Sequence, residues 1–315
     1  MEQNLWIGVD THQASIACYQ NGKFKEFKTT KDGFKKALQW AGKEALWAIE
    51  GAYCFGKPFS SYLIDNGCKV YEVNPILTKS YRKSLSICGQ KNDYGDAKII
   101  SLFAKNVKLQ EVSLQTIKLK EKLTARELLV KQRVDLINSI KNLYAIRGET
   151  IPFNRLNTLK AQKWLSAQDD TIISSFGNII KELNISIKAI EKEIEILLPE
   201  KALKLTSLTG VDTIRAAVIY TELKDKISTK EALASYAGVA PVENSSGKSL
   251  KHRNNKGGNR KLNSIFYQIS LNQSIYDTQG KIYYERKLAE GKSKRHARKC
   301  LARQLSNIVW KILKY

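Results

Sequence analysis

The sequence predicts an α/β domain followed by a helical middle and a mainly α-helical C-terminal part. Short apolar segments alternate with helical patterns in the first third of the chain, which is typical of an α/β domain. A heptad repeat of apolar residues fills the middle, and helical patterns broken by glycines fill the last third. We expect these parts to span residues 1–108, 109–200 and 201–315.

The N-terminal part is predicted to contain a mixed sheet. Asn21-Gly22 is a strong signal for a hairpin turn between two strands, and Gly67 is a typical residue for ending a helix. Two of the apolar strands end in an acid, Asp10 or Glu50. We expect strands at 5–10, 14–20, 23–27, 45–50 and 69–73, and helices at 31–43, 57–66 and 94–106.

The middle part is predicted to be a long helix at 115–148, a loop at 150–165 around Pro152, and a second long helix ended by Pro199. Apolar residues in the second helix recur in steps of three and four, the spacing of a coiled-coil seam. This seam can pack within one chain as an antiparallel hairpin or between two subunits, and both arrangements stay open. Its residues are Ile173, Phe176, Ile180, Leu183, Ile187, Ile190, Ile194 and Leu197.

The charge of the chain indicates a nucleic-acid partner. Lys and Arg number 53 against 30 Asp and Glu, a formal net charge of +23, and residues 248–315 hold 17 basic residues but only three acids. Clustered basic side chains release counterions from phosphates, which favours nucleic-acid binding. A membrane-surface role is less favoured, because no basic amphipathic anchor flanked by aromatic residues stands out.

Other features of the composition favour a cytoplasmic protein. The five cysteines are scattered without a CxxC pair, which fits a reducing compartment and argues against a disulfide framework or a zinc site. No apolar run reaches 18 residues, so we expect no membrane partner. The N-terminal residues lack the basic start of a signal peptide.

Four carboxylates form a candidate metal site. Asp10 and Glu50 end apolar strands, and such ends gather on one rim of a sheet. Asp93 and Asp96 lie three residues apart at the start of a helix, so both project from one face. Converging carboxylates repel one another unless cations bind, and hard oxygen ligands suit Mg²⁺ or Mn²⁺. Two such ions can hold the attacking and leaving oxygens of a phosphodiester.

These residues lie in motifs that resemble the DEDD insertion-sequence transposases, the bridge-RNA-guided recombinases related to the Piv invertase. Their N-terminal domain is similar to the RuvC resolvase, so the resemblance implies an RNase H-like fold and a metal role for all four carboxylates. The motifs are Gly8-Val9-Asp10-Thr11-His12, Ile49-Glu50-Gly51, Val73-Asn74-Pro75 and Lys91-Asn92-Asp93-Tyr94-Gly95-Asp96-Ala97. We expect His12 to have a positional rather than a catalytic role.

The resemblance continues through Tyr236–Pro241 and Glu243–Lys248, and it implies a serine nucleophile at Ser246. From the residues alone, Ser245-Ser246-Gly247 is an ordinary turn. A serine hydroxyl needs activation, and no His-Asp pair lies near in sequence, so the metal site is the physical option. Ser245 and, less strongly, Ser249 are the alternatives.

Basic residues that follow the serine are predicted to bind nucleic acid. Glycines between residues 251 and 261 allow the backbone to approach phosphates closely, and residues 292–303 are predicted to form a basic helix. The predicted contacts are Lys248, Lys251, Arg253, Lys256, Arg260, Lys261, Lys294, Arg295 and Arg298.

The resemblance implies the transposase of an insertion element, which cuts and rejoins donor and target DNA through a phosphoserine intermediate. It also implies guidance by an element-encoded bridge RNA. Strand exchange needs several active sites, so we expect a dimer that pairs into a tetramer on DNA. The competing functions are a RuvC-like endonuclease that uses metal-activated water, a DNA invertase without guide RNA, and a non-catalytic nucleic-acid-binding protein.

Overall fold

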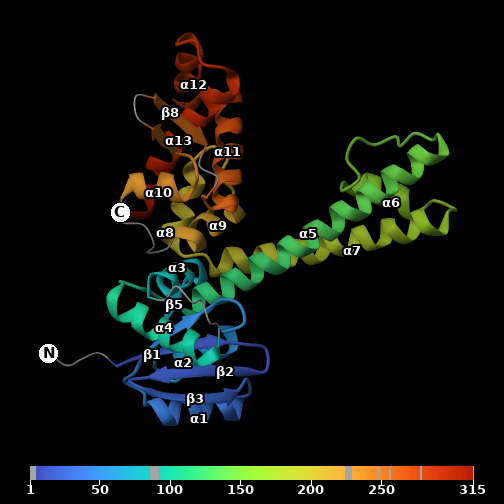
Figure 1. Ribbon diagram of the computed structural model, residues 1–315. Coiled ribbons are helices and arrows are strands. Elements are labelled where there is room, and N and C mark those ends of the chain that lie inside the picture. Colours follow the sequence, from blue (N-terminus) through green and yellow to red (C-terminus); the bar gives the residue numbers. More distant parts are fainter. Residues whose placement is uncertain are drawn as a thin grey trace. The chain divides into compact units, whose positions relative to one another are not determined.

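The computed structural model divides into two compact units, residues 1–118 and 119–315 (Figure 1). The three-part division expected from the sequence stays a prediction beside this observed division into two. The structure describes residues 5–85, 92–223, 229–246, 249–254, 257–276 and 279–314, with the backbone alone described for 243–246 and 249–254.

The first unit is built on a six-stranded mixed sheet in the order β3-β2-β1-β4-β5-β6. Strand β1 pairs antiparallel with β2 and parallel with β4, so the α/β architecture with a mixed sheet is observed as expected. The sheet consists of β1 (Trp6–Thr11), β2 (Ser15–Gln20), β3 (Lys23–Lys28), β4 (Leu46–Glu50), β5 (Lys69–Val73) and β6 (Gln110–Glu111).

Helices cover both faces of this sheet. Alternation along β4 sends Trp47 and Ile49 to one face and Ala48 to the other. The first face packs on α1 (Lys31–Ala41) and α2 (Lys57–Asp65), and the second on α3 (Pro75–Leu85) and α4 (Asp93–Asn106). Both layers are buried, which explains the short and nearly continuous apolar strands of the sequence.

Helix α3 and strand β6 were not predicted. Asn74-Pro75 stops β5 as expected, but it also begins α3, because the Asn74 side chain accepts a hydrogen bond from the Ile76 N–H at 2.9 Å. Proline suits the first position of a helix, where its missing N–H costs nothing. The same dipeptide therefore ends one element and starts the next.

In the second unit, α5 (Leu114–Arg147, whose first turn belongs to the first unit) runs antiparallel beside α7 (Thr171–Leu197), as Figure 1 shows. Arg126 Nε contacts Glu191 at 2.7 Å, and Arg147 contacts Asp170 at 2.6 Å near the opposite end of the pair. The heptad seam faces inward, since each of its residues is buried or half-buried. The seam is thus packed within one chain.

The loop expected at 150–165 is wrong in its second half, where α6 (Leu159–Ser166) forms. Thr158 caps this helix by accepting from the Ala161 N–H, and Leu165 packs into a buried cluster with Ile173 and Ile180 of α7. Hydrophobic contacts with residues further along the chain stabilise this short helix. The polar composition of the segment alone did not indicate a helix.

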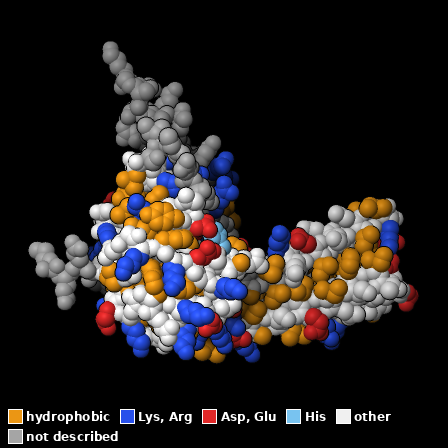
Figure 2. All heavy atoms as spheres, turned by 60° about the horizontal axis from the view of Figure 1, so that its bottom comes forward, with side chains coloured by type: hydrophobic (Ala, Val, Ile, Leu, Met, Phe, Trp, Pro, Cys, Tyr) orange, Lys and Arg blue, Asp and Glu red, His pale blue; other side chains and the backbone are white. Residues whose placement is uncertain are grey.

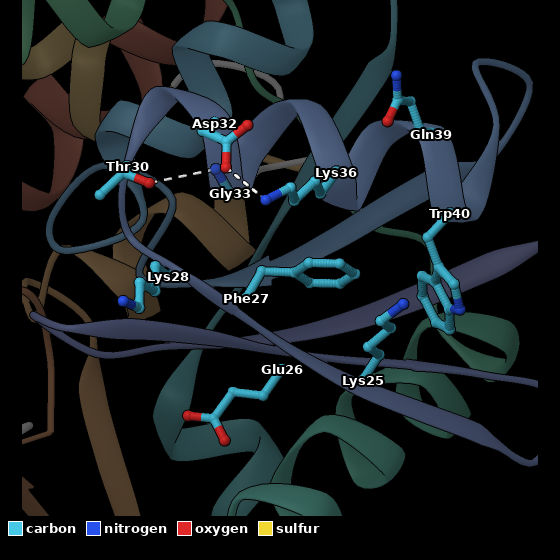
Figure 3. A pocket seen from close by; sticks show the side chains of 10 residues that line it. All are labelled: Lys25, Glu26, Phe27, Lys28, Thr30, Asp32, Gly33, Lys36, Gln39 and Trp40. Atoms are coloured by element: carbon cyan, nitrogen blue, oxygen red, sulfur yellow. Dashed lines mark hydrogen bonds and ion pairs between the residues drawn. The ribbon is translucent and has the colours of Figure 1, made fainter.

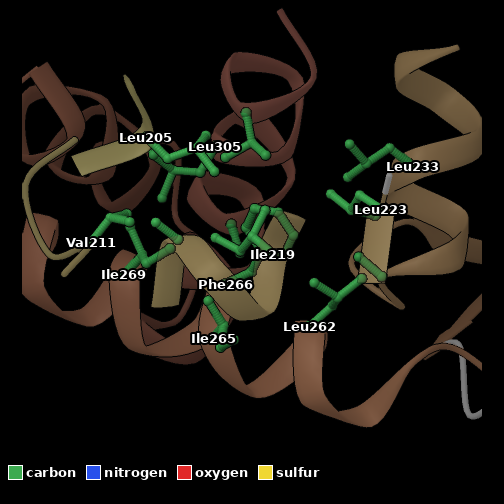
Figure 4. Close-up of a cluster of buried hydrophobic side chains, with 14 of the residues drawn as sticks. Leu205, Val211, Ile219, Leu223, Leu233, Leu262, Ile265, Phe266, Ile269 and Leu305 are labelled. Atoms are coloured by element: carbon green, nitrogen blue, oxygen red, sulfur yellow. The ribbon is translucent and has the colours of Figure 1, made fainter. Parts of the chain in front are cut away.

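The C-terminal part of the second unit is mainly helical, as Figure 4 shows for its core around Phe266, Ile219 and Leu305. Helices α11 and α13 are long, at 16 and 21 residues, although the glycine breaks of the sequence favour mostly short helices here, and a hairpin of two strands was not predicted. The elements are α8 (Glu200–Leu203), a 3₁₀ turn (Lys204–Ser207), α9 (Thr213–Leu223), α10 (Lys230–Tyr236), β7 (Pro241–Ser246), β8 (Ser249–Asn254), α11 (Arg260–Ile275), α12 (Gln279–Ala289) and α13 (Lys294–Lys314).

Hydrophobic side chains also run along the outside of the α5–α7 pair (Figure 2). Leu128 and Val134 of α5 and Ile179 and Ile185 of α7 are each exposed by 45 to 55%. These exposed side chains are therefore not needed for the contact between the two helices of one chain. No helix in the described part of the chain is long and apolar enough to cross a membrane.

Candidate metal centre

The sheet brings Asp10 and Glu50 to the same rim. Asp10 lies near the end of β1 and Glu50 ends β4, and these two strands are parallel neighbours. The Thr11 hydroxyl donates to the Glu50 carbonyl at 3.0 Å and links the two strand ends. Parallel strands expose their carboxyl ends at one edge, so the two acids meet there without help from a loop.

Helix α4 adds Asp93 and Asp96 to this rim. Asn92 caps the helix by accepting from the Gly95 N–H at 2.6 Å, which fixes the first turn that carries both acids. The helix crosses β1 very closely at Gly8, where a Cβ would lie 2.0 Å from the Ala97 carbonyl oxygen. Only glycine permits this approach, so Gly8 sets how near α4 lies to the strand.

Three ligand atoms converge on one side of the site. His12 Nε2 lies 3.2 Å from Asp10 Oδ2 and 3.4 Å from Asp93 Oδ1. Neighbouring ligands of an octahedral cation with bonds of about 2.1 Å stand about 3 Å apart. The spacing and the donor types therefore fit a divalent cation, with Asp10, His12 and Asp93 as the residues that would hold it.

The other side of the site is occupied by two side chains of α3. The Thr78 hydroxyl donates to Glu50 Oε2 at 3.0 Å, and the Arg82 guanidinium pairs with Asp96 Oδ1. Asp96 is only 6% exposed. Glu50 and Asp96 thus have partners on α3, whereas Asp10 and Asp93 face His12.

The electrostatics of the site favour a cation. Burial raises the pKa of Asp10, the nearby His12 lowers it, and Asp96 and Asp93 raise it further. Burial also raises the pKa of Glu50, against the hydrogen bond from Thr78. Asp93 and Asp96 thus lie within electrostatic reach of Asp10, as Asp10 and Asp96 do of Glu50, and a bound cation would offset that repulsion.

Sequence reasoning missed Thr78 and Arg82 and gave His12 only a positional role. All three contact a predicted carboxylate. The helix-starting signal of Asn74-Pro75, followed by Thr and Arg four residues apart, was the available indication, because that spacing puts both side chains on one helical face.

Ser246 and the predicted nucleic-acid contacts belong to the second unit. Ser246 ends β7 opposite Ser249 of β8, and only its backbone is described. Ser245 and Ser246 are thus strand residues and not the turn that the residues alone suggested, and Gly247 lies outside the described residues. Lys251 and Arg253 lie on β8, again with the backbone alone described, and Lys248 and Lys256 lie outside the described residues.

The remaining basic residues lie on α11 and α13. Arg260 and Lys294 and Arg295 are exposed. Lys261 is paired with Glu127 at 2.5 Å, and Arg298 lies over the Tyr284 ring at 5.8 Å from its centroid. Arg260, Lys294 and Arg295 are therefore more available to bind a phosphate than Lys261 and Arg298.

A separate hollow of about 570 Å³ lies between β3 and α1 (Figure 3). Phe27 and Trp40 share its lining with Lys25 and Lys28, and Lys36 pairs with Asp32 at 2.6 Å. None of the four carboxylates lines it. It is not part of the metal centre.

Two strand-end acids and two acids from one helical turn, on the rim of a mixed sheet, define a candidate site for metal-dependent cleavage of phosphodiesters. Residues 7–145 match the family model of the DEDD transposases of IS110, described as a transposase, and residues 202–285 match the transposase family IS116/IS110/IS902. Two separate segments of the chain are therefore similar to transposase families named after IS110.

A relative from Streptomyces coelicolor (strain ATCC BAA-471 / A3(2) / M145), the insertion element IS110 uncharacterized 43.6 kDa protein, is 33% identical over 150 residues. The match covers 46% of this chain and 37% of that protein, so it spans little more than a third of the relative.

Two solved structures of Thermus thermophilus RuvC are also similar, one of them in complex with a Holliday junction substrate. Each covers 34% of this chain and 99% of the RuvC chain, at 14% and 13% identity and TM-scores of 0.26 and 0.27. Superpositions at these TM-scores do not assign a fold. The RNase H-like class stays a prediction beside the observed α/β architecture.

Proposed function

We propose that this chain is the transposase of an insertion element and cuts and rejoins DNA with a divalent cation bound in the site that Asp10, Glu50, Asp93 and Asp96 form. The observation that carries the proposal is the convergence of these four acids from β1, β4 and α4 on one rim. The match of residues 7–145 to the DEDD transposases of IS110 supports the same reaction class.

The protein's own groups prepare the site in this account. Asp10 and Asp93 would hold the cation through their carboxylate oxygens, and His12 would add a nitrogen ligand. Glu50 is oriented by Thr78 and Asp96 by Arg82. Mg²⁺ or Mn²⁺ would act as a Lewis acid that stabilises negative charge on the scissile phosphate and on the leaving 3′ oxygen. The Asn92 cap holds Asp93 at the rim throughout.

Two nucleophiles compete in this account, the Ser246 hydroxyl and a water molecule. In the serine route, which we propose, Oγ forms a bond to phosphorus and the bond to the 3′ oxygen breaks. The serine proton passes to solvent, and the leaving 3′ oxygen takes up a proton from solvent to become a 3′ hydroxyl. The resulting phosphoserine link keeps the energy of the phosphodiester, so rejoining to an exchanged strand is the reverse step. In the water route the strand is hydrolysed and Ser246 takes no part.

Ser246→Ala should abolish a covalent protein–DNA adduct and reduce strand joining by at least about 10³-fold, because no other group replaces the nucleophile. The adduct is detected on a denaturing gel with DNA that flanks the gene. Ser245→Ala and Ser249→Ala are the matched controls and should keep the adduct. Normal cutting by Ser246→Ala without any adduct would establish the water route.

We also propose donor and target DNA and an element-encoded bridge RNA as partners. The net charge of +23 supports a large nucleic-acid surface, and the exposed Arg260, Lys294 and Arg295 lie on the matched C-terminal part or just after it. Sequencing the RNA that co-purifies with the protein tests the guide. A single abundant RNA encoded beside the gene is expected, and random cellular RNA alone would contradict it.

Replacing both Lys294 and Arg295 by alanine should weaken nucleic-acid binding without changing its sequence preference. If each side chain contacts one phosphate, the slope of log affinity against log salt should fall by about 2. Fluorescence anisotropy over a salt series measures this slope. A Lys287→Ala variant is the control, because Lys287 is already paired with Glu290 at 2.7 Å. An unchanged slope in the double variant would remove these residues from the interface.

A homodimer that pairs into a tetramer on DNA completes the proposal. The exposed apolar residues of α5 and α7, such as Leu128 and Ile185, support a contact between copies of the chain. Light scattering with DNA and RNA bound should give a mass of at least two chains, and a strictly monomeric mass would contradict it. We place this assembly in the cytoplasm, at the nucleoid.

A further inference from the structure

We propose that Arg82 takes the place of a second metal ion, so that the carboxylate site binds one divalent cation per chain. The inference rests on the proposed function, since it describes how that metal site is filled. In this proposal Asp10, His12 and Asp93 bind the cation. Glu50 and Asp96 instead bind side chains of helix α3.

The two halves of the site differ in what already neutralises them. On the cation side, the imidazole of His12 is the one basic side chain that the described residues place against Asp10 and Asp93, at 3.2 and 3.4 Å, and Asp10 also accepts a backbone hydrogen bond at Thr11. Asp93 is also half exposed, so a hydrated ion can reach it from solvent. On the α3 side, Asp96 is buried, and the permanent positive charge of the Arg82 guanidinium already balances its negative charge.

An arginine at this place keeps its charge under all ordinary conditions. A second divalent ion beside Asp96 would have to displace the guanidinium from its carboxylate or share the carboxylate with it. Sharing puts two positive charges next to each other in a partly buried site, where screening by water is weak. Arg82 is itself only 19% exposed, so it has little room to swing away.

Helix α3 holds this arrangement from one face. Thr78 and Arg82 are four residues apart, so one turn of helix delivers a hydroxyl to Glu50 and a guanidinium to Asp96. Thr78 also donates to the Pro75 carbonyl at 3.1 Å, which ties its side chain to the start of α3. The helix therefore organises both acids before any ion binds.

The guanidinium also retains hydrogen-bonding capacity. Its Nε is buried and has no hydrogen-bond partner among the described residues, while its NH2 group binds Asp96. Arginine offers five donors in a plane, a geometry that matches phosphate oxygens. We therefore propose that Arg82 binds the scissile phosphate on the side opposite the cation. There it neutralises the negative charge of the phosphate that a second metal ion would otherwise neutralise.

Counting bound Mn²⁺ by electron paramagnetic resonance on the full-length protein without DNA tests the inference. One ion per chain is expected for the natural protein and for Arg82→Lys, and two for Arg82→Met, which removes the charge and keeps the length. Two ions in the natural protein, or one in a folded Arg82→Met, would overturn the proposal. No bound ion at all would instead contradict the metal site of the proposed function.

Single acids give a second readout that does not depend on how Arg82→Met folds. Asp96→Asn should still bind one Mn²⁺ with an affinity within about 3-fold of the natural protein, whereas Asp93→Asn should lose at least about 10-fold, the scale expected when a metal ligand or its close support is removed. Equal losses in both variants would show that Asp96 is a ligand of the same ion and would overturn the division of the site.

Discussion

Replacing Asp10 by Asn should reduce DNA joining by at least about 10³-fold, the loss of several kcal/mol of transition-state stabilisation that a bound cation supplies. The change keeps the size of the side chain and removes its charge. Asp10 lies 3.2 Å from His12 and interacts electrostatically with Asp93, Asp96 and Glu50, so its charge reaches every part of the site. Joined products can be counted by sequencing from cells that carry the gene with its flanking DNA.

The matched control is Asp32→Asn. Asp32 is also an acid of the first unit, but it is exposed on α1, and Lys36 is its ion-pair partner among the described residues. Its loss removes a surface ion pair worth less than about 1 kcal/mol and should leave joining unchanged. Joining that survives in Asp10→Asn, with the protein present at the same level, would contradict a metal-dependent reaction at this site.

Gly8→Ala should destabilise the first unit by about 3 kcal/mol, at the upper end of the effects of overpacking. The new Cβ would lie 2.0 Å from the Ala97 carbonyl oxygen and 2.4 Å from the Ser101 nitrogen. Both atoms belong to the backbone of α4, so no side chain can turn away to make room. The helix must move, and Asp93 and Asp96 move with it. Urea unfolding measures the loss of stability.

Gly22→Ala provides the comparison. Gly22 has a φ of +88° in the β2–β3 turn, and nothing lies within 4 Å of a Cβ built there. Its substitution costs only the left-handed backbone penalty of about 1 kcal/mol. A Gly8→Ala variant no less stable than Gly22→Ala would show that α4 does not need to approach β1 so closely.

The sequence predicted much of this site because its acids sit at places that local patterns reveal. The apolar segments before Asp10 and Glu50 identify strands, and the strand ends determine where the acids lie. The position of Asp93 and Asp96 on one face of a helix follows from their spacing at the start of that helix. These inferences need only periodicity and the geometry of a sheet rim.

Other parts of the site depend on packing that no local pattern reveals. Arg82 meets Asp96 because α3 and α4 lie on the same face of the sheet, which is a tertiary arrangement. The role of His12 depends on its distance to Asp93, some eighty residues away in the chain. The β7–β8 hairpin was hidden because its strands are polar and alternate weakly, so turn-forming residues dominated the prediction.

Locating Mn²⁺ by anomalous scattering in crystals of the DNA-free protein tests the central claim most directly, because it needs neither the target sequence nor the RNA. The account predicts a peak coordinated by Asp10 and Asp93 at the rim formed by β1 and α4, lost in crystals of Asp10→Asn. No peak at this rim at saturating Mn²⁺, or a peak that persists unchanged in Asp10→Asn, would contradict it.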